Sequence, residues 1–175
     1  MKILVVVGAR PNFIKAFPLF EEFKKNKNIV PILVHTGQHY DYEMSKVFFG
    51  DLNIPKPDHN LHVGSGSHSI QTAKVMEKFE PIAIKENPGW IVVFGDVNST
   101  LAAALVASKL HIPLAHIEAG LRSFDKTMPE EVNRVLTDHV ADLLFCPTKK
   151  SVENLKKEGI SKDVYNVGDV MYDAY

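Results

Sequence analysis

Two acidic side chains occupy positions where acid–base chemistry could occur. Asp96 follows the apolar run WIVVF, and Glu118 follows the apolar run PLAHI. Carboxylates that face one crevice repel each other, so their pKa values separate, and one can donate a proton while the other accepts one. Glu118 also opens a dense run of ionisable residues that extends to position 134. That run is either an active-site rim or a loop followed by a well-capped helix.

Six short apolar runs are predicted to be strands that position these residues. Their Val, Ile, Leu and Phe residues are continuous rather than alternating, which is typical of strands covered on both faces. The runs are residues 3–7, 32–35, 90–94, 113–117, 143–146 and 164–167. Between them, apolar residues recur every three or four positions and indicate helices, as in Phe13, Phe17 and Phe20, or in Ile70, Ala73, Met76 and Phe79.

Strands that alternate with helices predict an α/β fold with a doubly wound parallel sheet. In such a sheet, ligands bind outside the carboxyl ends of the strands. Only residues that directly follow a strand are then candidates for a site. They are residues 8–12, 36–40, 95–100, 118–122 and 147–148.

Asp96 and Glu118 follow strands that are adjacent in sequence and therefore usually adjacent in the sheet. Neighbouring strands lie about 4.8 Å apart, so both carboxylates would face one crevice. Two interpretations stay open for Asp96, because aspartate is also a good N-cap for the helix predicted after it. Glu118 ends a buried strand and is followed by Ala-Gly, which favours a functional role.

The segment Thr127-Met128-Pro129-Glu130 matches a capping box, with Thr127 at the N-cap and Glu130 three residues later. Glu130 and Glu131 would also be stabilised by the positive end of the following helix. From local physics alone, Glu130 is therefore expected to be a capping residue.

The first strand is followed by Gly8-Ala9-Arg10-Pro11. Backbone N–H groups and Arg10 could hold an anion there, or the glycine could simply form a turn beside a solvated arginine. The segment is not GxGxxG, so a dinucleotide site is not supported.

Several classes of function are not supported by composition. Twenty basic and 21 acidic residues give a formal charge of −1, so binding to nucleic acid or to a membrane surface is not expected. The N-terminus has no signal-peptide pattern, and we expect a soluble cytoplasmic protein. The single cysteine, Cys146, excludes an internal disulfide and is expected to pack in the core.

No metal site is predicted, because His59, His62 and His68 lack the partner residues of known zinc motifs. These histidines belong to residues 51–69, an irregular region that is expected to form a mobile surface loop. Residues 1–168 are expected to form one domain. Residues 169–175 look like the start of a crossover into a second domain that this chain does not contain.

Five segments together resemble one family. GARPNFIK resembles its GTRPE-x-IK opening, TGQHYD its T-x-QH segment, and FGDVNST its GD-(T/V)-x-(S/T) turn. IEAGLRS followed by PEEVNR resembles the most specific pair of motifs of the non-hydrolysing UDP-N-acetylglucosamine 2-epimerases. The segments occur in the family's order over nearly the whole chain.

The resemblance implies the Rossmann-like N-terminal half of a glycosyltransferase-B type fold, with a UDP-sugar bound between two domains. It implies inversion at C2 of N-acetylglucosamine by elimination of UDP to 2-acetamidoglucal and readdition, with no metal or other cofactor. Asp96, Glu118 and Glu130 match the family's catalytic carboxylates. Arg10 and Arg122 match substrate-binding positions, and a homodimer is typical of the family.

The chain also departs from the family pattern. Gln38 and His39 match a region where some members bind an activating UDP-sugar, but Tyr40 follows where an arginine is common. Asn12 stands where many relatives have glutamate. Three alternatives stay open: a hydrolysing epimerase, an epimerase of another UDP-2-acetamido sugar, and an isolated domain that folds without turnover.

Overall fold

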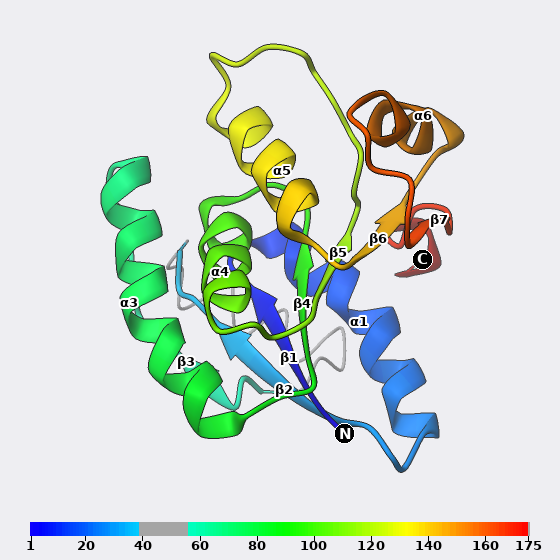
Figure 1. Ribbon diagram of the computed structural model, residues 1–175. Helices are drawn as coiled ribbons and strands as arrows, with labels where there is room; N and C mark the ends of the chain where they lie inside the picture. The colour runs from blue at the N-terminus through cyan, green and yellow to red at the C-terminus, as the bar shows by residue number, and fades with distance from the viewer. Residues whose placement is uncertain (39–55, 175) are drawn as a thin grey trace.

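The computed structural model describes residues 1–38 and 56–174 of the chain. These residues form a seven-stranded sheet in the order β3-β2-β1-β4-β5-β6-β7, and all the pairs are parallel. Figure 1 shows α3, α4 and α5 on one face of the sheet and α1 on the other. The predicted doubly wound α/β fold is confirmed.

The described strands are β1 (Lys2–Val7), β2 (Val30–His35), β3 (His59–Asn60), β4 (Trp90–Phe94), β5 (Leu114–Ile117), β6 (Leu143–Cys146) and β7 (Val164–Asn166). The helices are α1 (Arg10–Lys25), α3 (His68–Glu86), α4 (Asn98–Lys109), α5 (Pro129–Val140) and α6 (Lys149–Lys157), and a short 3₁₀ helix, η1 (Tyr172–Ala174), follows. All six predicted strands are confirmed to within two residues at either end.

The prediction of a surface loop over residues 51–69 is wrong for its described part, residues 56–69. β3 pairs with β2, and α3 begins at His68. Leu61 and Val63 are buried in the core. A strand of two residues is too short to show a periodic pattern, which is why the sequence did not reveal it.

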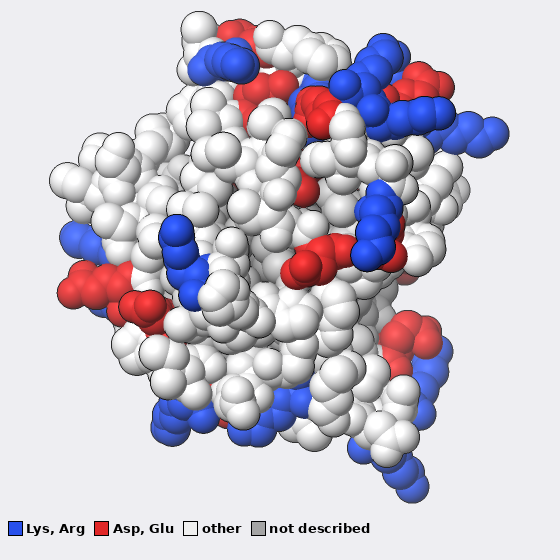
Figure 2. All heavy atoms as spheres, viewed as in Figure 1, with Lys and Arg blue, Asp and Glu red and all other residues white. Residues whose placement is uncertain are grey.

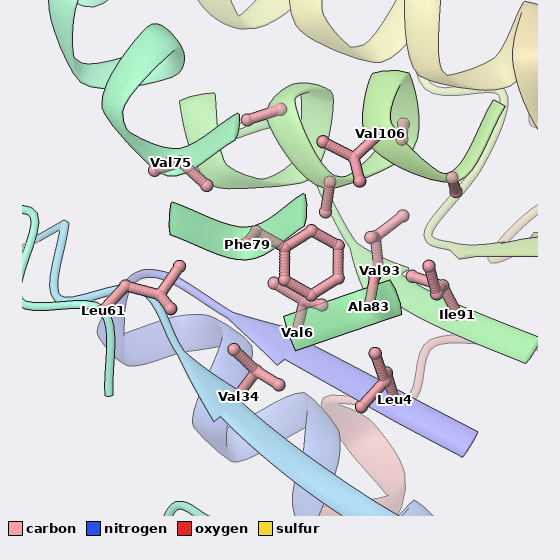
Figure 3. Packing of buried hydrophobic residues seen from close by; sticks show 14 of the residues in the cluster. Leu4, Val6, Val34, Leu61, Val75, Phe79, Ala83, Ile91, Val93 and Val106 are labelled. Carbon is pink, nitrogen blue, oxygen red and sulfur yellow. The ribbon is translucent and has the colours of Figure 1, made fainter. Parts of the chain in front are cut away.

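The larger core cluster lies between the sheet and the helices α3 and α4. Figure 3 shows the ring of Phe79 among side chains from β1 and β4, with Val6 and Val93 nearby. The predicted face of α3 is confirmed for Phe79, which is buried, and for Met76, which packs against the core, but it is wrong for Ile70, which is 55% exposed. The buried stripe instead repeats every fourth residue and includes a glutamine; its members are Gln71, Val75, Phe79 and Ala83.

α1 covers the other face over β1 and β2, where Phe13 and Phe20 are buried. Next to α1, the same face leaves an apolar groove of about 470 Å³. Its lining includes Trp90, Val92, Ala115, Ile117, Leu143 and Phe145. The sheet is therefore covered more completely on the face of α3, α4 and α5.

Cys146 is fully buried on β6 beside Leu144 and Leu155. Burial raises the pKa of its thiol to about 11, so the thiol stays protonated and unreactive. The prediction that this cysteine packs in the core is confirmed. Among the described residues, no helix has the length and apolarity needed to cross a bilayer.

Gly120 follows β5 and Gly159 follows α6, and both have positive φ angles. Comparing them provides a test of the packing around Gly120. A Cβ on Gly120 (φ 77°) would lie 2.5 Å from the carbonyl oxygen of Ser151, whereas a Cβ on Gly159 (φ 83°) would meet nothing within 4 Å. Gly159→Ala should lower the free energy of unfolding by about 1–2 kcal/mol, the cost of a left-handed non-glycine residue. Gly120→Ala should lose about 1–3 kcal/mol more from the clash. Urea unfolding monitored by circular dichroism would measure both, and equal losses would contradict the predicted contact.

Candidate active site

β4 and β5 end side by side at the carboxyl edge of the sheet. Phe94 is paired with Ile117, and the Gly95 amide donates to the Ile117 carbonyl at 3.0 Å. The Oε2 atom of Glu118 lies 3.0 Å from the point where a Cβ on Gly95 would stand. The predicted adjacency of the two turns is therefore confirmed, and the Glu118 carboxylate lies against the residue that precedes Asp96.

Glu118 has a φ angle of 73°, which is uncommon for a residue with a side chain. A left-handed conformation costs about 1–2 kcal/mol. Strained residues of this kind cluster at functional sites. The backbone of Glu118 thus agrees with a functional role for its carboxylate.

Lys15 on α1 forms an ion pair with Glu118. Sequence reasoning missed this residue. The side chain of Lys15 is only 9% exposed, and Lys15 is followed by Ala16, which is fully buried on the apolar face of α1. A lysine next to the buried stripe of a helix was the available signal, because a buried ammonium group needs a partner.

Asn12 binds the backbone amides of the turn that precedes α1. Its Oδ1 atom accepts from the backbone N–H groups of Gly8 and Ala9, both at 3.1 Å, and its Nδ2 atom donates to the Phe94 carbonyl. A side chain of the same turn thus occupies these two amides, and an anion-binding role for Arg10 stays a prediction. Arg10 lies on the exposed side of the first turn of α1.

Asp96 does not cap α4, whose N-cap is Val97 without a side-chain hydrogen bond. The Asp96 carboxylate instead forms an ion pair with Arg134 on α5. The Asp96 carbonyl accepts from the Nδ2 atom of Asn133 at 2.8 Å. The start of α5 therefore holds the turn that carries Asp96.

The predicted capping box at α5 is also wrong. Met128 is the N-cap, and it makes no side-chain capping bond. Asp125 accepts two hydrogen bonds from Thr127, one from its backbone at 2.9 Å and one from its hydroxyl at 2.6 Å. Thr127 is thus engaged in the preceding turn, and Glu130 has no capping role.

Glu131, the next residue, is the buried one, with 3% of its surface exposed. Its carboxylate accepts from the backbone N–H groups of Ser123 and Phe124, both at 2.9 Å, and from the Ser123 hydroxyl. Burial acts to raise the pKa of Glu131, but these hydrogen bonds and the charge of Arg134 lower it overall. Glu131 therefore anchors the loop between β5 and α5.

Glu130 is half-buried and lines a polar hollow of about 240 Å³. Among residues 1–38 and 56–174, no hydrogen bond or ion pair involves the Glu130 side chain. The hollow is also lined by Gln38, Ser65, Gly66, His68, Gln71, Val97, Asn98 and Asn133. Gln38, whose Oε1 atom accepts from the Ser99 amide and hydroxyl, thus shares a hollow with Glu130. His39 lies outside the described residues.

Arg122 does not face this hollow. Its guanidinium is 1% exposed and forms ion pairs with Asp138 at 2.7 Å and Glu158 at 2.6 Å. Burial alone would lower the pKa of Arg122, but its bonds to the two carboxylates raise it. The structure therefore gives Arg122 two carboxylate partners within the chain, and the substrate contact expected from the sequence stays a prediction.

Charged side chains of both signs are mixed over the visible face. Figure 2 shows blue and red groups intermingled at the upper right, over α6, rather than a patch of one sign. Among the described residues, no three His, Cys, Asp or Glu side chains gather to hold a metal ion. His59 contacts Glu86, and His68 contacts Asn98.

Comparison with known proteins decides the family. The family described as UDP-N-acetylglucosamine 2-epimerase matches residues 21–175. The chain belongs to the UDP-N-acetylglucosamine 2-epimerase family. A UDP-N-acetylglucosamine 2-epimerase homolog of Methanococcus maripaludis is 56% identical over 174 residues, which cover 99% of this chain and 48% of the relative. A UDP-2,3-diacetamido-2,3-dideoxy-D-glucuronate 2-epimerase of Pseudomonas aeruginosa is 52% identical, with 99% of this chain and 50% of that protein covered.

A solved structure of this epimerase family has the same fold. The UDP-GlcNAc 2-epimerase of Methanocaldococcus jannaschii, in complex with UDP-GlcNAc and UDP, superimposes with a TM-score of 0.96 at 49% identity. The match covers 99% of this chain and 48% of that one. The chain thus spans about half the length of the relatives it matches, and its sheet has the Rossmann-like fold of those epimerases.

Glu130 and Glu131 are neighbours with different environments, so variants of the two test whether Glu131 anchors the loop between β5 and α5. Glu131→Gln should lower the free energy of unfolding at pH 7 by about 1–3 kcal/mol, because it weakens the acceptor of three hydrogen bonds. Glu130→Gln should change it by less than about 0.5 kcal/mol, as expected for a side chain without partners among the described residues. Urea unfolding of both variants provides the comparison.

The loss in Glu131→Gln should also depend on pH. The pKa of Glu131 is lower in the folded chain than its ordinary value of 4.5. The stabilisation by the carboxylate is therefore complete above the unfolded-state pKa and is lost as the pH falls through the lowered folded-state pKa. The stability difference between the two variants should shrink in that acidic window, and a constant difference would contradict the anchoring role.

Proposed function

We propose that the protein carrying this chain interconverts UDP-N-acetylglucosamine and UDP-N-acetylmannosamine. A base removes the proton at C2 while the C1–O bond breaks and UDP leaves with the electron pair, which gives 2-acetamidoglucal. UDP then adds back at C1, and a proton is delivered to the opposite face of C2. The sugar gains and loses the same atoms, so the reaction is redox-neutral and needs no oxidant or reductant.

The observation that carries this proposal is the approach of the Glu118 carboxylate to Gly95, which directly precedes Asp96. Removing and returning a proton on opposite faces of one carbon needs acid–base groups in different positions. Asp96 and Glu118 on adjacent turns, with Glu130 in the hollow beside Val97, provide three carboxylates for these roles. The family membership of the chain supports the same reaction.

Cationic groups would stabilise the departing diphosphate. We assign this role to Arg10 at the start of α1. Lys15, further along the same helix, is paired with Glu118. The amides of Gly8 and Ala9 are occupied by Asn12, so side chains would have to provide the positive charge. Gln38 is a further candidate contact in the hollow that contains Glu130.

Turnover in deuterated water tests the elimination mechanism. Nuclear magnetic resonance should show deuterium at C2 of both UDP-sugars when the protein is incubated with UDP-N-acetylglucosamine. Turnover with hydrogen retained at C2 would rule out proton abstraction there. Release of free N-acetylmannosamine and UDP would instead assign the hydrolysing reaction.

A second substrate deserves a parallel assay. The relative named for UDP-2,3-diacetamido-2,3-dideoxy-D-glucuronate is 52% identical, whereas a UDP-N-acetylglucosamine 2-epimerase of Methanococcus maripaludis is 50% identical. A higher kcat/KM with the diacetamido glucuronate would reassign the substrate. It would leave the chemistry at C2 unchanged.

Glu130→Gln separates chemistry from folding. We expect a loss of about 10²–10⁴-fold in kcat, the usual contribution of a general acid or base. The midpoint of thermal unfolding should stay at the wild-type value, because the side chain has no protein partner among the described residues. Glu131→Gln is the control that loses stability. A Glu130→Gln protein with wild-type kcat would remove Glu130 from the mechanism.

We also propose that residues 1–168 are the N-terminal domain of a two-domain protein, with residues 169–175 beginning the crossover. The relatives are about twice as long as this chain, which supports this division. Residues 1–175 alone should then show negligible turnover. For the complete protein we propose a homodimer, since Ile70, Val132 and Leu136 on α3 and α5 are exposed apolar side chains that a partner surface could cover.

A further inference from the structure

His116 is a fully buried, polar residue on β5, two positions before Glu118. Its Nε2 atom lies 2.8 Å from the carbonyl oxygen of Gly95. Its Nδ1 atom lies 2.7 Å from Oδ1 of Asp138 on α5. Both ring nitrogens are thus hydrogen-bonded to oxygen atoms inside the protein.

The partners decide where the ring hydrogens are. The carbonyl of Gly95 can only accept, so Nε2 must carry a hydrogen. Oδ2 of Asp138 already accepts from the Gly120 amide at 3.0 Å and from Arg122 at 2.7 Å. The ion pair with Arg122 is that of a carboxylate, so both oxygens of Asp138 accept and Nδ1 must also donate.

The surroundings balance the charge of a ring that carries both hydrogens. With both hydrogens on its ring, His116 would add a second positive charge to that of Arg122, and Asp138 and Glu158 would supply two negative ones. The thiol of Cys146 on β6 interacts electrostatically with Asp138 and Arg122, and it stays neutral because its pKa is raised. Buried charges are tolerated when they are paired and hydrogen-bonded in this way.

The same bonds connect the two turns of the candidate site. They run from the Gly95 carbonyl through His116 and Asp138 to the Gly120 amide. Gly95 directly precedes Asp96, and Gly120 lies two residues after Glu118. We propose that His116 is held as an imidazolium and is a positioning residue that sets the separation of the Asp96 and Glu118 turns.

The charge state can be tested on the wild-type protein. Nitrogen NMR of protein labelled with ¹⁵N-histidine should show a hydrogen on both ring nitrogens of His116 at pH 7.5, where an ordinary exposed histidine is neutral. The signal is assigned by its absence from the His116→Gln spectrum. A ring with one unprotonated nitrogen would overturn the imidazolium.

Two substitutions at His116 remove one hydrogen bond of the ring each and keep the other. Glutamine can place a donor near the position of Nε2 and keep the bond to Gly95, whereas asparagine can place one near Nδ1 and keep the bond to Asp138. His116→Asn should therefore release the Asp96 turn and lower kcat by about 10–100-fold, the effect of a small misplacement of catalytic groups, with KM within about threefold. His116→Gln should lose less, and His139→Gln, which changes an exposed histidine on α5, should lose nothing.

The predicted changes in kcat rest on the proposed epimerase function. A failure of the positioning role can be distinguished from a failure of that function. Wild-type protein without epimerase activity, but with a doubly protonated His116, would overturn the proposed function and leave the charged bridge in place. Folded His116→Asn protein with wild-type kcat would overturn the positioning role. If one of the two variants fails to fold, the spectrum of the other assigns the His116 signal, and the wild-type spectrum then decides the charge state.

Discussion

The parallel pairing of β4 with β5 is the constraint on which the candidate site depends. Phe94 is aligned with Ile117, so the loops that follow β4 and β5 begin next to each other at the carboxyl edge of the sheet. Two loops that leave side by side place Asp96 and Glu118 within one neighbourhood before any side chain contributes. Apart from His116 on β5, the buried residues of the two strands are apolar, which fixes their register through the core rather than through the polar residues beyond it.

The polar residues of these loops provide hydrogen-bond partners that the end of a buried sheet requires. Loops at the end of a buried sheet bring carbonyls, amides and carboxylates into a region with little water, and each needs a partner. α5 provides many of these partners from its first turns, through Glu131, Asn133 and Arg134. Glu130 is the acidic residue of that segment left without a partner among the described residues, so PEEVNR contains side chains that support the loops and one carboxylate that does not.

Much of the architecture could be predicted because apolar runs are local and strong signals. The order of strands and the adjacency of the two carboxylate turns followed from general rules for parallel sheets. The capping box failed because a sequence match cannot show that Thr127 prefers Asp125, two residues earlier. Lys15 and His116 were missed because their partners, Glu118 and Asp138, lie 103 and 22 residues away in sequence. Long-range polar contacts of this kind leave little trace in a single sequence.

The backbone strain at Glu118 is opposed by the ion pair of its carboxylate with Lys15. At a φ angle of 73°, glycine would relieve the local strain, and asparagine would tolerate the conformation better than glutamate does. Either change would remove the carboxylate that lies over Gly95. It would also leave the ammonium group of Lys15, whose side chain is only 9% exposed, without its partner. Removing one partner of a buried ion pair costs about 3–5 kcal/mol, more than the relief of strain returns. A screen for thermostable variants would therefore tend to keep glutamate at this position in spite of its backbone angle.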